Sequence, residues 1–104
     1  MNFKIEFTKR AIKELKNLPV QTQKQILDET LILETDPFKF KKKIKRIKSF
    51  KFPCFRLRID TSNDSYRLFY GIDKDIIFVL RIISKKDADK IISRLRKTDF
   101  PPYI

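Results

Sequence analysis

The sequence contains no histidine and no tryptophan, and only one cysteine and one glycine among its 104 residues. The single cysteine, Cys54, excludes a disulfide within the chain, and with no histidine it leaves no plausible zinc site. No stretch approaches the roughly 18 apolar residues of a membrane span, and residues 1–10 lack the apolar core of a secretory signal. We therefore expect a cytoplasmic protein without a metal, a cofactor or a membrane partner.

Acidic residues are also scarce. Against 25 Lys and Arg there are 13 Asp and Glu, so the formal net charge is +12. Such a charge favours polyanions, namely nucleic acid, an anionic membrane surface or an acidic protein. Apolar residues still make up 41% of the chain and include ten Phe, which is enough for a packed core. The length suits one domain that spans residues 1–104.

The first third of the chain predicts a strand and a helical hairpin. Residues 3–7 alternate between apolar and charged side chains, which is typical of a half-buried strand. Thr8 is a suitable N-cap for a helix that begins at Lys9 and ends at Pro19, and residues 20–35 form a second helix. The apolar stripe expected on this second helix consists of Val20, Ile26, Leu27 and Leu31.

Residues 39–51 are dominated by Lys and Arg, with Phe and Ile side chains spaced between them. A solvated charged segment is one interpretation. The apolar spacing favours another, in which the segment is pinned to the body of the protein and displays its cations outward. On that interpretation its nucleic-acid contacts come from Lys42, Lys43, Lys45, Arg46, Lys48 and Lys51.

Three runs with period two follow, at residues 55–60, 66–72 and 76–83, and short polar turns separate them. They predict antiparallel strands linked as hairpins, and residues 86–97 predict a closing helix. The expected fold is α+β, with the order β-α-α-β-β-β-α. A small antiparallel sheet is packed on one face by the N-terminal helical hairpin.

Alternation along the first two of these strands indicates how they pair. In residues 55–60 the apolar side chains occupy one face, which leaves Arg56 and Arg58 on the other. In residues 66–72 the same alternation separates Arg67 from the apolar positions. If both apolar sets meet the helices, the register pairs Ile59 with Tyr66, Leu57 with Leu68 and Phe55 with Tyr70. Arg58 then lies directly opposite Arg67.

A fourth arginine is expected on the same face. If Leu68 pairs with Leu80 on the third strand, Arg81 lies beside Arg67. Like charges that face each other on a sheet are destabilising, which suggests that an anion binds between them. Alternatively, the arginines only solvate the exposed face or pair with carboxylates such as Asp60, the one acidic residue expected there. Arginine forms bidentate hydrogen bonds with phosphate oxygens, so phosphate is the predicted ligand.

The combination of these motifs resembles the RelE/ParE toxin superfamily, over nearly the whole chain. The resemblance is carried by Ala11-x-x-x-Leu15-x-x-Leu18-Pro19, Asp36-Pro37, Phe55-Arg56-Leu57-Arg58-Ile59, Tyr66-Arg67-Leu68-Phe69-Tyr70 and Ile77-Phe78-Val79-Leu80-Arg81-Ile82. It implies the toxin of a type II toxin-antitoxin system, neutralised by an acidic antitoxin in a heterodimer or heterotetramer. For the RelE branch it implies an endoribonuclease that cuts mRNA on the ribosome without a metal. Ribosomal RNA is then a second binding partner.

The resemblance also implies roles for individual residues. By position, the catalytic residues are Arg56, Arg58, Arg67 and Lys85, and Arg67 matches the arginine that stabilises the phosphoryl group. Arg81 and Lys86 join the lysine-rich segment as RNA contacts. Arginine stands at Arg56 and Arg58 where the family often has lysine, and it cannot serve as a base near neutral pH. The remaining candidates for the base are Lys48, Lys51, Lys85 and Lys86.

A second departure concerns the tyrosine that the RelE branch carries early in its last helix, because Ile91 stands at this position. Tyr103 is a possible substitute from the C-terminal tail. Two other functions therefore stay open. One is a ParE-like toxin that inhibits DNA gyrase through protein contacts, and the other is a catalytically weak relative that only binds RNA.

Overall fold

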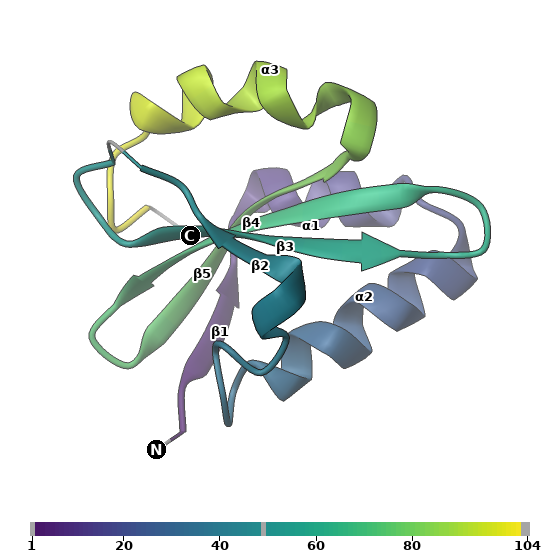
Figure 1. Cartoon of the computed structure of the whole chain (residues 1–104), viewed down its shortest axis with the longest axis horizontal. Coiled ribbons are helices and arrows are strands. Elements are labelled where there is room, and N and C mark those ends of the chain that lie inside the picture. The colour runs from purple at the N-terminus through teal and green to yellow at the C-terminus, as the bar shows by residue number, and fades with distance from the viewer. Residues whose placement is uncertain (1, 49, 103–104) are drawn as a thin grey trace.

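The computed structural model describes residues 2–48 and 50–102 as a curved sheet between helices (Figure 1). In chain order its elements are β1 (Lys4–Phe7), α1 (Lys9–Lys16), α2 (Val20–Ile32), the short 3-10 helix η1 (Lys41–Lys43), β2 (Ile44–Arg46), β3 (Cys54–Asp60), β4 (Ser65–Asp73), β5 (Ile76–Ser84) and α3 (Lys85–Arg96). The predicted α+β fold is confirmed. Residues 44–46 add a short strand that the sequence analysis did not predict.

The five strands form one sheet in the order β1-β5-β4-β3-β2. Neighbouring strands are antiparallel except for β1, which pairs in parallel with β5. The sheet is therefore mixed, and not purely antiparallel as predicted. None of the helices among the described residues is long and apolar enough to cross a membrane.

Two hydrophobic clusters lie on opposite faces of the sheet. The first joins Ala11 and Leu15 of α1 and Ile26 of α2 to one face, so the predicted helical hairpin does cover that face. The second cluster joins the other face to α3, through side chains such as Ile91 and Leu95. Helices thus pack on both faces, while the far end of β3 and β4 extends beyond α3 (Figure 1).

The two N-terminal helices differ in how well their buried faces were predicted. In α1, Thr8 caps the helix as expected, because its hydroxyl accepts a hydrogen bond from the backbone N–H of Ala11 at 3.1 Å. In α2 the predicted stripe is wrong except at Ile26. The buried side chains of α2 are Thr22, Ile26 and Thr30. The side chains of Val20, Leu27 and Leu31 are instead exposed, at 77%, 40% and 58%.

Candidate nucleic-acid interface

Arg58 and Arg67 face each other across β3 and β4, as the alternation predicts. The observed register contains all three predicted pairs, Ile59 with Tyr66, Leu57 with Leu68 and Phe55 with Tyr70. The apolar members of these pairs lie in or against the core beneath α1 and α2, which leaves the arginines on the other side of the sheet. We call the surface of Arg56, Arg58 and Arg67 the arginine face.

A hydrogen-bonded chain at the end of the hairpin holds two of these arginines. The carboxylate of Asp60 lies 3.2 Å from Nε of Arg58 and accepts a hydrogen bond of 2.6 Å from the Ser65 hydroxyl. The oxygen of Ser65 in turn accepts a hydrogen bond from Nη1 of Arg67 at 2.8 Å. One carboxylate therefore positions Arg58 directly and Arg67 through Ser65.

The same chain of contacts sets the protonation of the site. The hydrogen bond from Ser65, together with the charges of Arg58 and Arg67, holds the pKa of Asp60 below its ordinary value. Partial burial and the neighbouring Arg56 lower the pKa of Arg67. An ionised Asp60 is a weak base and a good anchor for cations, so its role here is to orient the guanidinium groups.

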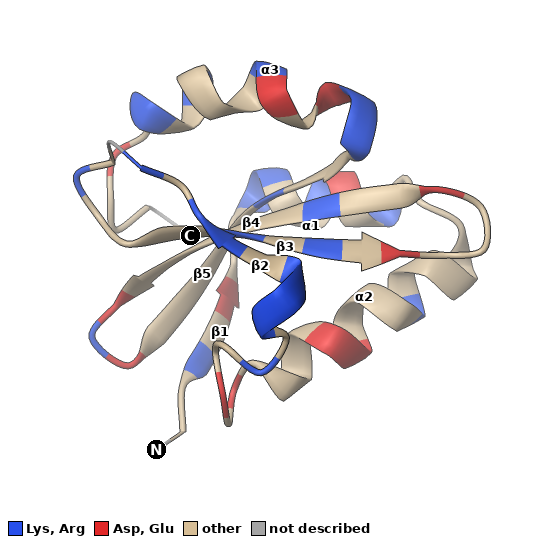
Figure 2. Ribbon diagram, viewed as in Figure 1, with Lys and Arg blue, Asp and Glu red and all other residues tan. Residues whose placement is uncertain are grey.

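Lysines from η1 and β2 complete a basic pocket over the arginine face. The pocket has a volume of about 170 Å³, and its lining contains six cations, one apolar residue and no carboxylate. The lining residues are Lys42, Lys43, Ile44, Lys45, Arg56, Arg58 and Arg67. Lys45 pairs with Arg56 across β2 and β3, which places both side chains on the same face. Figure 2 shows the basic segments of η1 and β2 beside those of β3 and β4.

A second carboxylate approaches the arginine face from α3. Oδ1 of Asp89 lies 3.6 Å from Nη1 of Arg56, and the Asp89 side chain is 92% exposed. The sequence analysis missed this contact because it depends on how α3 crosses the sheet. At this distance and exposure the pair contributes little, so the basic pocket remains available to an external anion.

The prediction that Arg81 joins the arginine face is wrong. Leu68 pairs with Ile82 and not with Leu80, a shift of two residues. One residue of the shift is already present where Tyr70 pairs with Val79, and the bulge at Leu80 adds the other. The Arg81 guanidinium instead forms a bidentate ion pair with Glu14 of α1, with Nη2 at 2.7 Å from Oε2. Arg81 therefore lies against α1 and outside the basic pocket.

The other predicted cations are spread over the surface. Arg46 lies over the ring of Phe55, on the face that α1 and α2 cover. Lys51 lies beside the C-terminal end of α3. Exposed side chains without a contact to the basic pocket are found at Lys48, Lys85 and Lys86. The RNA-binding or catalytic roles of these five residues stay predictions.

Ile91, which stands where the RelE branch carries a tyrosine, has its side chain in the interior. Ile91 is 6% exposed and packs in the second cluster under α3. Tyr103 lies outside the described residues. Among residues 2–48 and 50–102, no group of three or more histidine, cysteine or acidic side chains is placed to hold a metal ion. The charged groups that line the basic pocket are guanidinium and ammonium groups.

Residues 5–89 match the family model described as the ParE toxin of the type II toxin-antitoxin system parDE. No curated protein sequence matches the chain.

Several solved structures share the fold. A free-state mutant of the E. coli toxin RelE aligns with a TM-score of 0.73 at 24% identity, covering 93% of this chain and 97% of that one. In the archaeal RelE-RelB complex from Pyrococcus horikoshii OT3 the TM-score is 0.69 at 21% identity, with coverages of 82% and 97%. In the toxin-antitoxin complex RelBE2 from Mycobacterium tuberculosis it is 0.63 at 24% identity, with coverages of 82% and 100%.

Proposed function

We propose that this chain, which belongs to the ParE toxin family of type II toxin-antitoxin systems within the RelE/ParE superfamily, is a toxin that cleaves mRNA on the ribosome. The observation that supports this proposal is the basic pocket, in which six cations surround a space of about 170 Å³. A phosphodiester group supplies the negative charge that this lining lacks, and guanidinium groups bind its oxygens in bidentate fashion.

The proposed reaction needs three operations on one RNA linkage. The ribose 2′-oxygen loses its proton and attacks the adjacent phosphorus, negative charge grows on the phosphoryl oxygens, and the 5′-oxygen leaves with a proton. The products are a 2′,3′-cyclic phosphate and a 5′-hydroxyl. Arg67, held by Ser65, is placed to stabilise the phosphoryl oxygens, and Arg56 and Arg58 hold the flanking charge.

Proton transfer is assigned to the lysines of the basic pocket. Lysine, unlike arginine, can act as a base when its surroundings favour the neutral form. Lys45 shares a face with Arg56 and is our choice for the group that takes the 2′-proton. The 5′-oxygen then receives a proton from Lys42 or Lys43, which line the same pocket.

A cell-free translation reaction tests the proposal. Addition of the protein should cleave ribosome-bound mRNA and leave 2′,3′-cyclic phosphate ends, which primer extension and end analysis detect. Arg67→Ala should lower the cleavage rate by about 100-fold or more, since it removes charge stabilisation of the transition state. Lys45→Arg keeps the charge and removes the base, so a loss of about 10²-fold or more is expected.

Arg96→Ala is the matched control, because Arg96 lies at the end of α3 outside the basic pocket. It removes the same charge and should leave cleavage unchanged. Intact mRNA on stalled ribosomes, or full activity of Arg67→Ala, would overturn the proposal. RNA binding without cleavage would identify a relative that only binds RNA.

A second candidate function is inhibition of DNA gyrase through protein contacts. The match to the ParE family model favours it, as do the buried Ile91 and the arginines at positions where the family often has lysine. A supercoiling assay with purified gyrase separates the two functions. A gyrase inhibitor acts without ribosomes, whereas the proposed ribonuclease leaves supercoiling unchanged.

The proposed partner is an acidic antitoxin whose chain folds as it wraps the toxin. Two features of this chain support it. The net charge of +12 attracts an acidic partner, and α2 exposes the apolar side chains of Val20, Leu27 and Leu31. Exposed apolar side chains on one helix are typical of a surface that a partner covers.

A further inference from the structure

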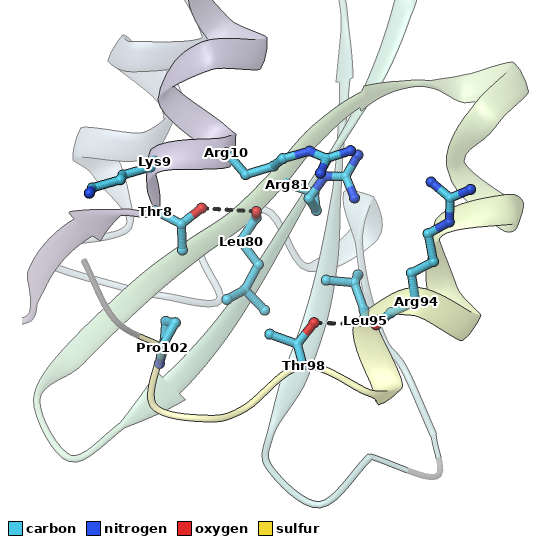
Figure 3. A pocket seen from close by; sticks show the side chains of 9 residues that line it. All are labelled: Thr8, Lys9, Arg10, Leu80, Arg81, Arg94, Leu95, Thr98 and Pro102. Atoms are coloured by element: carbon cyan, nitrogen blue, oxygen red, sulfur yellow. Dashed lines mark hydrogen bonds between the residues drawn. The ribbon is translucent and has the colours of Figure 1, made fainter.

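A second cationic pocket lies between α1, β5 and the C-terminal end of α3 (Figure 3). Its volume is about 380 Å³, within the range of small-molecule sites. Its lining consists of Thr8, Lys9, Arg10, Leu80, Arg81, Arg94, Leu95, Thr98 and Pro102. None of these residues lines the basic pocket, so the two sites are separate.

Most of the positive charge of this second pocket has no counter-ion among the described residues. Four of its lining residues are cations and none is acidic. Glu14, from outside the lining, neutralises Arg81 alone, and no ion pair with a described residue involves Arg10 or Arg94. In Figure 3 the Arg10 side chain reaches toward the Arg81 guanidinium, while Arg94 extends from α3 on the other side of the pocket.

Glu14 holds the guanidinium of Arg81, a lining residue, in a fixed position. It accepts hydrogen bonds from Nε and Nη2 of Arg81 and from the backbone N–H of Ile82 at 3.0 Å. Nη1 of Arg81 donates to no described residue, so it stays available as a donor in a fixed position. A fixed donor beside two exposed guanidinium groups suits an anion with several oxygens, because each oxygen can accept a separate hydrogen bond.

The base of the pocket is apolar. Most of the surface that the pocket exposes is apolar. Leu80 and Leu95 lie beneath it at only 3% exposure each, and Thr98 and Pro102 are the more exposed members of the lining. A bare inorganic anion would leave this surface unused. A ligand that joins an anion to a flat, weakly polar group would cover it and gain from removing it from water.

We propose that this second pocket binds a nucleotide, with its phosphate on Arg10, Arg94 and Nη1 of Arg81 and its nucleobase against Thr98 and Pro102. The nucleotide is either free or part of single-stranded RNA, since both present a phosphate next to a base. The site is independent of cleavage at the basic pocket, and it stands even if the proposed function fails.

Calorimetric titration of the full chain with uridine and adenosine 5′-monophosphates and with inorganic phosphate tests the site. The nucleotides should bind at least about tenfold more tightly than phosphate, because only they cover the apolar surface of the pocket. The double variant Arg10→Gln/Arg94→Gln should weaken nucleotide binding by about tenfold or more. The same loss should appear when both proteins also carry Arg67→Ala, which weakens anion binding at the basic pocket and so separates the two sites.

Lys90→Gln/Arg96→Gln is the matched control, because it removes two exposed charges from α3 outside the second pocket. Equal weakening in this control would show attraction to the net charge only and overturn the proposal, as would equal binding of phosphate and nucleotide.

A titration with a short single-stranded oligonucleotide then identifies the source of the nucleotide. If it binds more tightly than the mononucleotide and loses that gain in Arg10→Gln/Arg94→Gln, the site holds RNA; if not, it holds a free nucleotide. Preferential binding of a glutamate-rich peptide over both would assign the pocket to a protein partner and overturn the nucleotide site.

Discussion

Arg58 and Arg67 lie directly opposite each other on β3 and β4, and the single carboxylate of Asp60 connects them. Two like charges in facing positions destabilise a sheet, and the carboxylate offsets part of that cost. Because Asp60 sits at the end of the strand and is half exposed, it leaves the outer side of both guanidinium groups open to an anion.

Replacement of Asp60 tests this balance. Asp60→Asn should lower the free energy of unfolding by about 0.5 to 1 kcal/mol at low salt, the scale of an exposed ion pair. At 1 M salt the loss should largely disappear, because screening weakens both the lost attraction and the arginine repulsion. Urea denaturation at the two salt concentrations measures it. A loss that is the same at both would show that Asp60 acts through packing instead of charge.

The ion pair between Glu14 and Arg81 should be the more important electrostatic contact for stability. Glu14→Ala leaves Arg81 and the N–H of Ile82 without their partner, so we expect a loss of about 2 to 3 kcal/mol in unfolding free energy. Adding Arg81→Met should recover part of it. Asp28→Ala, an exposed change on α2, should stay within about 0.5 kcal/mol. The decisive measurement is the unfolding free energy that the double variant Glu14→Ala/Arg81→Met recovers relative to Glu14→Ala, determined by urea denaturation.

Gly71 is the position on β4 where the C-terminal tail approaches the sheet. A Cβ atom there would lie 2.6 Å from Cε2 of Phe100, whose ring stacks on Phe52 with centroids 4.0 Å apart. Gly71→Ala should therefore cost about 1 to 3 kcal/mol of stability through overpacking. In a Phe100→Leu background the same change should cost less. Equal costs in the two backgrounds would place the strain elsewhere.

The buried thiol of Cys54 should make stability depend on alkaline pH. Burial raises its pKa to about 12 from 9.0, so the folded state keeps a proton that the unfolded chain loses above pH 9. The stabilising effect is complete below pH 9 and declines as the pH rises toward 12. Between pH 8 and pH 10 this contribution should fall by about 1.4 kcal/mol, and Cys54→Ala should remove it. Urea unfolding of both proteins at the two pH values gives the difference.

The exposed face of α2 should matter for the partner and not for folding. Leu31 is 58% exposed, so Leu31→Glu should leave the unfolding free energy within about 0.5 kcal/mol of the parent. The same change places a negative charge on the surface that an acidic antitoxin is proposed to cover. Co-purification with the protein encoded next to it should therefore weaken. Unchanged co-purification would place the antitoxin on another surface.

The sequence predicts the β3–β4 register correctly because a slip by one residue would bury the arginines and expose the apolar positions. It fails at β5, where the pairing is one residue off at Tyr70 and Val79 and the bulge at Leu80 adds a second residue that alternation cannot reveal. Arg81 is misplaced for that reason, and its partner Glu14 lies 67 residues away in the chain.

The remaining differences arise from threonine and from short strands. Thr30 is buried in α2 because its hydroxyl donates to the backbone oxygen of Ile26 at 2.7 Å, so a residue classed as polar can face the core. Residues 44–46 form a strand only because β3 offers an edge, and no pattern of three residues predicts that. Both the basic pocket's lysines and the carboxylate of Asp89 reach the arginine face through such tertiary placement.

The parallel pairing of β1 with β5 has a consequence for synthesis of the protein. Lys4 and Phe7 find their partners Ile76 and Val79 only after most of the chain has been made. Until then β1 has no neighbour in the sheet and β4 lacks one of its two. A nascent chain that stops before β5 therefore cannot complete its sheet, because both β1 and β4 still lack a neighbouring strand.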